Sequence, residues 1–371
     1  MKILIAPDSF KECMTAYDAC LCIQKGIQQY NKDIVTCLCP LADGGEGTLE
    51  TLVYAMKGTV EYYDVHGPIM NRIQAPIGFV DDIAIIECAK VCGLELLKEG
   101  NKNPYQTTTY GLGELIQHAL SKNVKQITIC LGGSATNDGG IGMLQALGVC
   151  FLDYHKQQVV PTMKGLFDIC EINQDFIDQR LKDVSIIGVC DVTNPLCGLQ
   201  GSTYIYGPQK GVLFSERAKI DQAMKKYAQK ASMLLQNNYI NDSGAGAAGG
   251  LGFALKSFLN AELKKGFDVV SETVNLESKV QECDIVIVGE GKMDQQTQYG
   301  KTPYGVLKIA QKYHKNVYAF AGKVDDLSLL KEIGFQNVYQ ITPYDMNLSN
   351  ALKKGKENLS QAVYQHLGEM I

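Results

Sequence analysis

The chain has 371 residues, of which 46% are hydrophobic and 20% charged, and its formal net charge is -5 at pH 7. These proportions are normal for a globular protein and exclude a disordered chain, while the length suggests two α/β-sized domains. Lysine and arginine are spread along the chain without a basic block, which argues against a nucleic-acid-binding protein.

The N-terminal part of the chain alternates strand and helix patterns. Apolar residues at helical spacing from Ala16 to Ile27 predict an amphipathic helix, and Thr15 is a suitable N-cap for it. The first residues show no basic region followed by a long apolar run, so we expect no signal peptide. The predicted elements are a strand at 2–6, a helix at 15–30, a strand at 35–39, a helix at 48–56 and a strand at 59–65.

The middle of the chain has a less regular pattern. Gly67, Pro68, Pro76 and Gly78 interrupt it and predict short strands or hairpins. Apolar runs then predict strands at 83–87, 126–131 and 186–189, with helices at 89–97 and 111–120. The last part returns to simple alternation, with strands at 284–288, 316–321 and 338–341 and helices at 303–313, 327–333 and 347–367.

Three strand–helix units at each end of the chain can build one parallel sheet. We therefore predict an α/β protein with two domains. The first is a discontinuous, Rossmann-like domain with a parallel six-stranded sheet, made of residues 1–65 and 283–371. The second is an inserted α/β domain with a mixed sheet, made of residues 66–282.

The chain contains thirteen cysteines, an odd number for a disulfide framework. There is no C-x2-C pair with accompanying histidines, so a zinc site is not expected. Most cysteines lie in apolar runs, which predicts reduced, structural thiols in a cytosolic protein. No apolar stretch approaches the ~20 residues of a membrane span.

Polar, glycine-rich turns follow several predicted strands, and in open α/β sheets these strand ends form the ligand crevice. Carboxylates there can hold Mg²⁺ or take a proton, while Lys11, Lys292 and Lys301 can balance phosphate charge. Asp and Gly are also ordinary turn residues, but the turns taken together favour phosphoryl transfer. They are Pro7–Lys11, Ala42–Glu46, Asn137-Asp138, Asp191–Asn194 and Glu290–Asp294.

Three further segments resemble nucleotide-binding loops. Gly132–Gly140 has four glycines in nine positions before a predicted helix, which suits a backbone anion site. Gly244–Gly249 matches G-x-G-x-x-G, but polar residues 237–243 predict no strand before it, so a phosphate-cradling or close-packing turn is favoured over NAD binding. Gly300-Lys301-Thr302 ends like a Walker A loop, but Gln295 stands where that motif needs glycine; Lys301 is either a phosphate ligand or a solvated lysine.

Long strings of the sequence resemble the bacterial glycerate kinase type-1 family, in order and through nearly the whole chain. The chain departs from the family at Glu12-Cys13-Met14, where Gly-Ser-Leu is usual. The matching strings are Ala6–Lys11, Pro40–Thr48, Gly132–Gly140, Asp191–Leu196, Gly207–Gly211, Gly244–Gly252, and Gly289–Gly291 with Asp294–Thr297.

The resemblance implies two α/β domains that enclose a cleft with the active site. It implies an enzyme that uses ATP and Mg²⁺ to phosphorylate D-glycerate, giving 2-phosphoglycerate in most bacterial members; 3-phosphoglycerate is the other recorded product. It further implies an enzyme of organic-acid and glyoxylate catabolism whose partners are glycerate and ATP. Because no signal peptide, membrane span or basic block is expected, we predict a cytoplasmic protein that binds neither nucleic acid nor a membrane. A homodimer stays open.

Roles within the matching motifs follow from the kinase reaction. We expect Asp191 or Asp43 to act as the base toward the substrate hydroxyl, with Lys11 as a catalytic cation. Glu290 and Asp294 are the candidates for the Mg²⁺ site. Lys11, Lys210 and Lys301 are expected to balance the glycerate carboxylate and the phosphate. The other expected substrate- or phosphate-binding residues are Ser9, Gly133, Ser134, Asn137, Asp138, Asn194, Gln209 and Gly246.

Two other classes of protein compete with the kinase. A non-catalytic sugar-acid-binding or sensor protein on the same fold is the alternative, and the retained acidic motifs argue against it because a binder has no use for Mg²⁺ carboxylates. The third interpretation, a nicotinamide-dependent oxidoreductase, is supported only by Gly244–Gly249.

Overall fold

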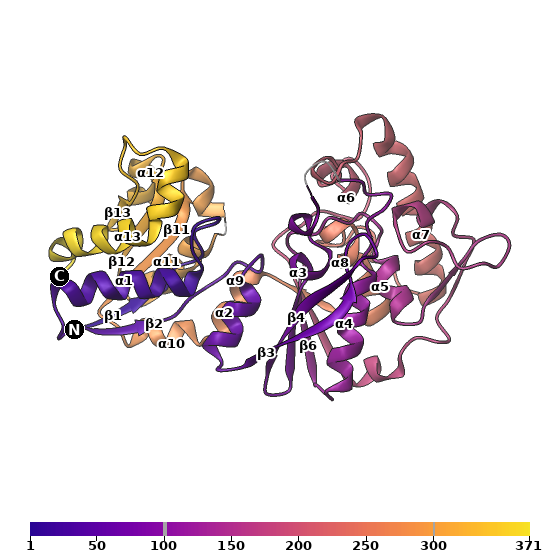
Figure 1. The fold of residues 1–371 in the computed structure, drawn as a ribbon, viewed down its shortest axis with the longest axis horizontal. Coiled ribbons are helices and arrows are strands. Elements are labelled where there is room, and N and C mark those ends of the chain that lie inside the picture. The colour runs from indigo at the N-terminus through magenta and orange to yellow at the C-terminus, as the bar shows by residue number, and fades with distance from the viewer. Residues whose placement is uncertain (99–101, 300) are drawn as a thin grey trace. The chain divides into compact units, whose positions relative to one another are not determined.

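A computed structural model describes residues 1–98, 102–299 and 301–371 and forms two compact units. Unit 1 consists of Met1–Asp43, Glu50–Met56 and Phe267–Ile371, so both chain ends belong to it (Figure 1). Unit 2 consists of Gly44–Leu49 and Lys57–Gly266. The prediction of an α/β protein with a discontinuous parallel-sheet domain and a mixed-sheet domain is confirmed.

The sheet of unit 1 is entirely parallel among the described residues and has the order β13-β12-β11-β1-β2. Numbered within the unit, this is the order 2-1-3-4-5 of flavodoxin-like folds. The strands are β1 (Lys2–Ile5), β2 (Val35–Leu38), β11 (Ile285–Met293), β12 (Asn316–Val324) and β13 (Asn337–Gln340).

The predicted sixth strand of this sheet is wrong. Residues Thr59–His66 form β3, which pairs with β4 (Arg72–Val80) in unit 2, so the parallel sheet has five strands in the described part of the chain. The physical reason lies in its side chains. Much of β3 is exposed, which suits an antiparallel edge strand, whereas β1 and β11 are apolar runs buried on both faces.

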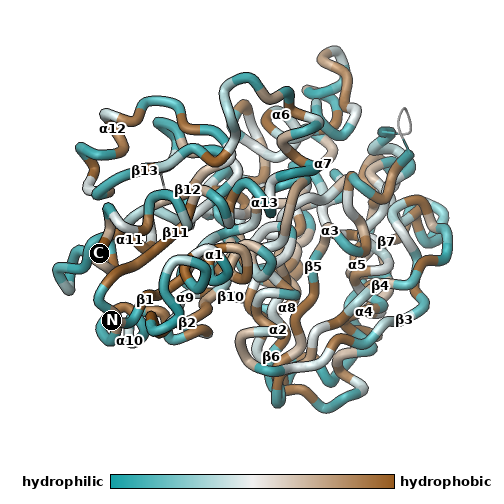
Figure 2. Tube along the Cα trace, turned by 60° about the vertical axis from the view of Figure 1, so that its left-hand side comes forward, coloured by the Kyte–Doolittle hydropathy of each residue, from teal (hydrophilic) through white to brown (hydrophobic). Residues whose placement is uncertain are grey.

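Helices cover both faces of the unit 1 sheet. Helix α1 (Ala16–Tyr30) packs on α13 (Leu348–His366), and both bury Ile3, Ile5 and Ile287. Helix α11 (Thr302–Lys312) contacts β11 and β12 on the opposite face, above Val286 and Val288. Figure 2 shows the apolar start of β11 in brown. The remaining helices are α2 (Thr48–Ala55), whose first two residues belong to unit 2, α9 (Gly266–Thr273), which begins at the last residue of unit 2, α10 (Leu276–Gln281) and α12 (Leu327–Glu332).

Local sequence signals account for the starts of two helices in unit 1, α1 and α13. Thr15 Oγ1 accepts a hydrogen bond from Asp18 N at 3.1 Å, which confirms the predicted N-cap of α1. Asn347 Oδ1 caps α13 in the same way through Asn350 N at 3.0 Å. Each cap satisfies a backbone N–H that has no partner inside the helix.

The sheet of unit 2 is mixed and has the order β10-β9-β6-β5-β4-β3. The first four strands run parallel, and β4 and β3 are antiparallel to their neighbours. A separate hairpin of β7 (Cys150–Leu152) and β8 (Glu171–Asn173) lies outside it. The other elements are β5 (Ile83–Glu87), β6 (Gln126–Cys130), β9 (Ser185–Val189), β10 (Glu262–Lys264), α3 (Cys88–Cys92), α4 (Tyr110–Ser121), α5 (Ile141–Ala146), α6 (Ser202–Ile205), α7 (Arg217–Leu235) and α8 (Leu251–Leu259).

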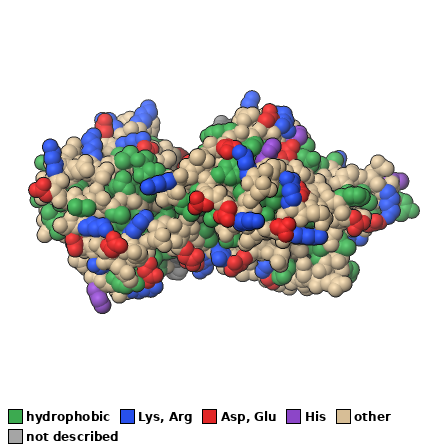
Figure 3. Space-filling view, turned by 90° about the horizontal axis from the view of Figure 1, so that it is seen from below, with side chains coloured by type: hydrophobic (Ala, Val, Ile, Leu, Met, Phe, Trp, Pro, Cys, Tyr) green, Lys and Arg blue, Asp and Glu red, His purple; other side chains and the backbone are tan. Residues whose placement is uncertain are grey.

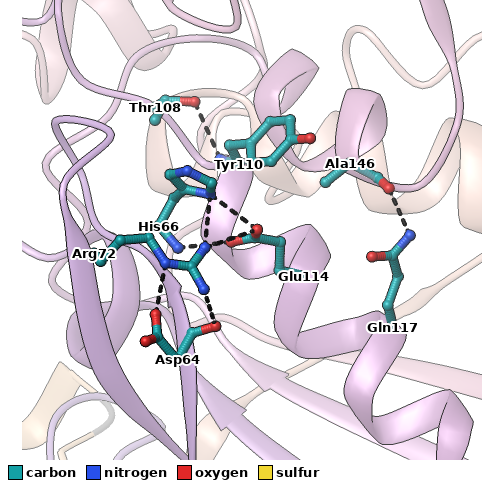
Figure 4. A network of polar contacts seen from close by, with 8 residues as sticks. All are labelled: Asp64, His66, Arg72, Thr108, Tyr110, Glu114, Gln117 and Ala146. Carbon is teal, nitrogen blue, oxygen red and sulfur yellow. Dashed lines mark hydrogen bonds and ion pairs between the residues drawn. The ribbon is translucent and has the colours of Figure 1, made fainter.

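A polar network fastens the β3–β4 hairpin to α4 (Figure 4). Glu114 Oε2 accepts from His66 N at 2.6 Å, and its Oε1 lies 2.9 Å from His66 Nδ1. Arg72 donates to Asp64 Oδ1 and to the Asp64 carbonyl, both at 2.6 Å. These bonds lie at the edge of unit 2 and hold the antiparallel strands in register.

The surface carries no dominant sign of charge on the face drawn in Figure 3, where acidic and basic side chains are interspersed. Within the described ranges, no helix is both long enough and apolar enough to span a membrane.

Candidate active site

The strand order of unit 1 reverses between β1 and β11, and ligands of open α/β sheets bind at such a switch point. Asp8 follows β1, and Glu290 lies near the end of β11. The backbone N–H of Asp8 donates to the Gly289 carbonyl at 2.8 Å, which holds the turn after β1 against β11. The sheet topology therefore brings these two carboxylates to one edge.

Asp8 is held by hydrogen bonds at this edge of the sheet, where burial and a neighbouring carboxylate disfavour its ionised form. Its Oδ2 accepts from Thr302 Oγ1 at 2.5 Å, and its Oδ1 accepts from Ser9 N at 2.6 Å. Burial, followed by the negative charge of Asp43, raises the pKa of Asp8 to about 6, although these hydrogen bonds and Lys11 oppose the rise. Asp8 and Asp43 thus repel each other at the switch point.

Glu290 extends the acidic cluster. Its Oε1 accepts from Thr297 Oγ1 at 3.3 Å, and its Oε2 lies 3.4 Å from Lys301 Nζ. Burial raises the pKa of Glu290 to about 7; Lys301 opposes this rise and the charge of Asp8 adds to it. Asp8 therefore interacts with both Asp43 and Glu290, and we call these three side chains the acidic cluster.

Asp294, the second predicted metal ligand, lies in a different environment. Its Oδ2 pairs with Lys292 Nζ at 2.9 Å, and its Oδ1 accepts from Gln296 N at 2.9 Å. The hydrogen bond from Lys292 lowers the pKa of Asp294. Lys301 Nζ donates to the Lys292 carbonyl at 3.0 Å, so Lys301 links this turn to Glu290.

Unit 2 carries a buried lysine at its own strand ends. Lys210 is only 3% exposed, and its Nζ donates to Ser134 Oγ at 3.0 Å and to the Thr136 carbonyl at 2.7 Å. Burial lowers the pKa of Lys210 to about 8. Its charge therefore lies directly behind the glycine-rich loop, in which Gly133 is exposed with a φ of +74°.

Asn137 and Asp138 are completely buried in the same loop and hold it in place. Asn137 Nδ2 donates to Thr203 Oγ1 at 3.1 Å. Asp138 Oδ2 accepts from both N and Oγ1 of Thr109, at 2.9 and 2.8 Å, and Oδ1 accepts from Gly140 N at 3.0 Å. Burial raises the pKa of Asp138 against these bonds. The contacts of both side chains are internal to unit 2.

Asp191 is an exposed residue after β9, and its Oδ1 accepts from Gly266 N at 2.9 Å. It lines a cavity of about 530 Å³ in unit 2 together with Thr193, Lys256 and Lys264. Two further carboxylates, Asp242 and Glu262, also line this cavity and pair with Lys256 and Lys264, respectively.

Asn194 and Gly246 lie in two loops of unit 2 that are joined by a backbone hydrogen bond. Asn194 Oδ1 accepts a hydrogen bond from Tyr206 OH at 2.5 Å, and the backbone carbonyl of Asn194 accepts one from Gly246 N at 3.0 Å. A Cβ on Gly246 would lie 2.3 Å from the Pro195 carbonyl oxygen, so close packing requires glycine there. No strand precedes Gly244 in the described segment 237–243, in agreement with the rejection of a dinucleotide fold. Gln209 is exposed.

The structure thus sorts the predicted residues into two groups. Unit 1 holds Ser9, Lys11, Asp43, Glu290, Asp294 and Lys301; unit 2 holds Gly133, Ser134, Asn137, Asp138, Asp191, Asn194, Gln209, Lys210 and Gly246.

The sequence prediction missed Asp8, Thr297 and Thr302 as members of the site. A signal for Asp8 was present, because it lies in the first turn after a strand, within Pro7–Lys11. Thr297 and Thr302 lie in segments that sequence motifs mark, but no local pattern indicates that they donate to Glu290 and Asp8, respectively.

The topology, the acidic cluster and the lysine-bearing loops define an α/β enzyme with the charged groups that phosphoryl transfer requires. The family model described as "Glycerate kinase family" matches residues 3–370. The chain belongs to the glycerate kinase family, and it is a kinase.

Individual relatives match over nearly their whole length. A "Glycerate kinase" of Bacillus subtilis (strain 168) is 40% identical over 364 residues, which are 97% of this chain and 95% of that protein. A "Glycerate 2-kinase" of Escherichia coli (strain K12) is 40% identical over 365 residues, 98% and 96% of the two chains. The crystal structure of a Salmonella typhimurium LT2 protein described as a glycerate kinase 2 superposes with a TM-score of 0.90 at 38% identity, covering 100% of this chain and 98% of that one.

Proposed function

We propose that the protein transfers the γ-phosphoryl group of ATP to the 2-hydroxyl of D-glycerate and releases ADP and 2-phosphoglycerate. The acidic cluster at the switch point of unit 1, with Lys11 and Lys301 beside it, is the observation that carries this proposal. The E. coli relative, named a glycerate 2-kinase, supports the choice of hydroxyl.

Mg²⁺ belongs to the proposal because two carboxylates of the acidic cluster, Asp8 and Glu290, can contribute to a cation site. Burial raises the pKa values of both carboxylates, and repulsion from Asp43 at Asp8 and from Asp8 at Glu290 adds to the rise, so a bound cation would stabilise both ionised forms. Mg²⁺ is usually held by one or two carboxylates together with phosphates and water. Across 1–98, 102–299 and 301–371, no group of three or more His, Cys, Asp or Glu side chains could hold a metal ion by itself, so Mg²⁺ at Asp8 and Glu290 would also need phosphate and water ligands. When bound, Mg²⁺ would neutralise charge on the phosphates.

Asp43 is the base that we favour, because its charge acts on Asp8 within the acidic cluster. The glycerate hydroxyl oxygen attacks the γ-phosphorus, the bond from that phosphorus to the ADP oxygen breaks, and the hydroxyl proton moves to Asp43. Lys11 and Lys301 would stabilise negative charge on the transferred group, as cations do in phosphoryl transfer.

The glycine-rich loop of unit 2 is proposed to bind the glycerate carboxylate. Lys210 places a buried positive charge behind Gly133 and Ser134, and the exposed Gly133 lets an anion approach the backbone. Asn137 and Asp138 support the loop through Thr203 and Thr109.

We also propose that this enzyme is cytoplasmic and acts in organic-acid and glyoxylate catabolism. All thirteen cysteines lie in the described part of the chain, and each is a free thiol, which suits a reducing compartment.

The decisive test incubates the protein with Mg-ATP and D-glycerate, follows ADP release, and identifies the product by phosphorus NMR. We expect 2-phosphoglycerate, with L-glycerate as the control substrate. A spectrum of 3-phosphoglycerate would refute the assigned hydroxyl, and absence of ADP formation would refute the proposed reaction.

A further inference from the structure

A cavity of about 450 Å³ lies in unit 1 at the carboxyl ends of β11, β12 and β13. Gly291 and Gly322 line it on the strands, Phe10 and Ile341 line it beside them, and Leu352 of α13 closes another side. It therefore lies on the α13 face of the sheet edge that also carries the acidic cluster.

The size and chemistry of this cavity do not suit glycerate. Its volume is in the range of about 300–1,000 Å³ that is usual for sites of drug-sized ligands, and apolar side chains provide most of its wall. A three-carbon hydroxy acid is polar throughout and would leave this wall in contact with water. A purine nucleoside has a flat apolar face and the size to fill it.

The fold itself does not require glycine at position 291, where the missing side chain leaves room in the cavity. Its φ is not in the left-handed region, and a Cβ built on it would come no closer than 3.6 Å to any neighbouring atom, the nearest being Lys11 N. Gly322 differs, because its Cβ would lie 2.5 Å from the Gly291 carbonyl oxygen. Since neither the backbone nor the packing demands glycine at position 291, the missing side chain keeps the cavity open for a ligand.

The rim of the cavity exposes large apolar side chains. Tyr344 is 98% exposed and Leu348 is 73% exposed, and both line the cavity. Solvent-facing aromatic rings of this kind stack on nucleic bases.

Polar groups mark where a ribose and a phosphate chain would lie. The carboxylate of Asp325 lines the cavity, oriented by Lys292 at 3.1 Å and Lys323 at 3.3 Å, and a carboxylate at a strand end can accept hydrogen bonds from ribose hydroxyls. Lys11 also lines the cavity and belongs to the turn that carries Asp8. A chain of phosphates leaving the cavity past Lys11 would reach the acidic cluster.

We infer that this cavity binds the purine nucleoside of the phosphoryl donor, with the base stacked on Tyr344 and the ribose beside Asp325. The inference rests on the proposed function for the identity of the donor. It adds the location of the nucleoside and a role for residues 340–355, which no sequence motif marked.

The test is direct binding of Mg-ADP to the full chain, measured by calorimetry for the wild type, Gly291→Ala and Tyr344→Ala. We expect Gly291→Ala to weaken Mg-ADP about tenfold, because its methyl group occupies the nucleoside site, and to keep the thermal midpoint of the wild type. Tyr344→Ala should weaken Mg-ADP about fivefold through lost stacking. Tyr154→Ala removes a tyrosine that is 83% exposed in unit 2, and this matched control should bind as the wild type does.

Inorganic tripolyphosphate separates the nucleoside from the phosphates, and we expect it to compete equally well in all four proteins. Wild-type binding of Mg-ADP by both cavity variants, or equal weakening of tripolyphosphate and Mg-ADP, would overturn the inference. So would a rise confined to the KM for glycerate, which would assign the cavity to the acceptor. A wild type that binds Mg-ADP but transfers no phosphoryl group to glycerate would refute the proposed reaction while the binding comparison still decides the cavity.

Discussion

The two units place buried charges of opposite sign where their parallel strands end. In unit 1, burial raises the pKa of Asp8 to about 6 and that of Glu290 to about 7. In unit 2, burial lowers the pKa of Lys210 to about 8. In all three cases the removal of water disfavours the charged form, so a ligand of opposite charge recovers free energy that folding gave up. Unit 1 is thereby suited to a cation and unit 2 to an anion.

The largest predicted loss of activity comes from a substitution in the acidic cluster of unit 1. Asp43→Asn removes the proposed base and should lower kcat by a factor of about 10² to 10⁴ without loss of thermal stability, as initial rates and a melting curve will show. Asp33→Asn, at an exposed carboxylate of the same unit, is the matched control. Asp191→Asn tests the other carboxylate expected as the base, and near-normal turnover of both variants would place the base elsewhere.

The buried positive charge of unit 2 is tested by Lys210→Met, which keeps much of the side-chain volume and removes the charge. The KM for glycerate should rise about 10- to 100-fold, because the positive charge behind the anion-binding loop is lost, while the KM for ATP changes little. Lys182→Met, at an exposed lysine of unit 2, should change neither constant. If the KM for ATP rises instead, the anion bound by this loop is the phosphate and not the glycerate carboxylate.

The pH dependence of stability sharpens the comparison further. The pKa of Glu290 rises from 4.5 in the unfolded chain to about 7 in the folded one, so the folded state keeps a proton that the unfolded state has released. The contribution of Glu290 to stability is therefore full below pH 4.5 and is lost as pH rises through about 7. The amide in Glu290→Gln does not titrate, so this variant does not lose the stability that the wild type loses at this position as pH rises. Relative to the wild type, it should be stabilised more at pH 8 than at pH 5, by about 2 kcal/mol in urea unfolding of the metal-free protein.

Glu332→Gln, at an exposed glutamate on α12, should give the same stability difference from the wild type at both pH values. A pH-independent effect of Glu290→Gln would mean that the carboxylate is ionised in the folded protein at pH 5, which contradicts the contrast between the units.

The smallest expected effect belongs to Lys301, whose side chain is 34% exposed and lies 3.4 Å from Glu290. Lys301→Ala should raise the KM for ATP about threefold to tenfold, since solvent screens much of its charge. Lys331→Ala, at an exposed lysine of the same unit, serves as its control. An unchanged KM would identify Lys301 as a solvated residue at the start of α11.

Much of the fold was predictable because its signals are local. The apolar spacing of α1 and its cap at Thr15 lie within a few residues, and both appear in the structure as predicted. Strand β3 shows the limit of such signals. Its alternating pattern identifies a strand, but the pattern does not say whether the partner is β2 or β4.

The candidate site divides in the same way. The sequence by itself determined that polar turns with carboxylates and lysines follow the strands, because turn chemistry and strand patterns are properties of neighbouring residues. Only the tertiary structure decided that Asp8 interacts with Asp43 and Glu290, that Lys210 is buried behind Ser134, and that Asn137 and Asp138 bind Thr203 and Thr109. Burial and charge repulsion depend on distances between residues far apart in the chain, and those distances exist only once the strands have paired.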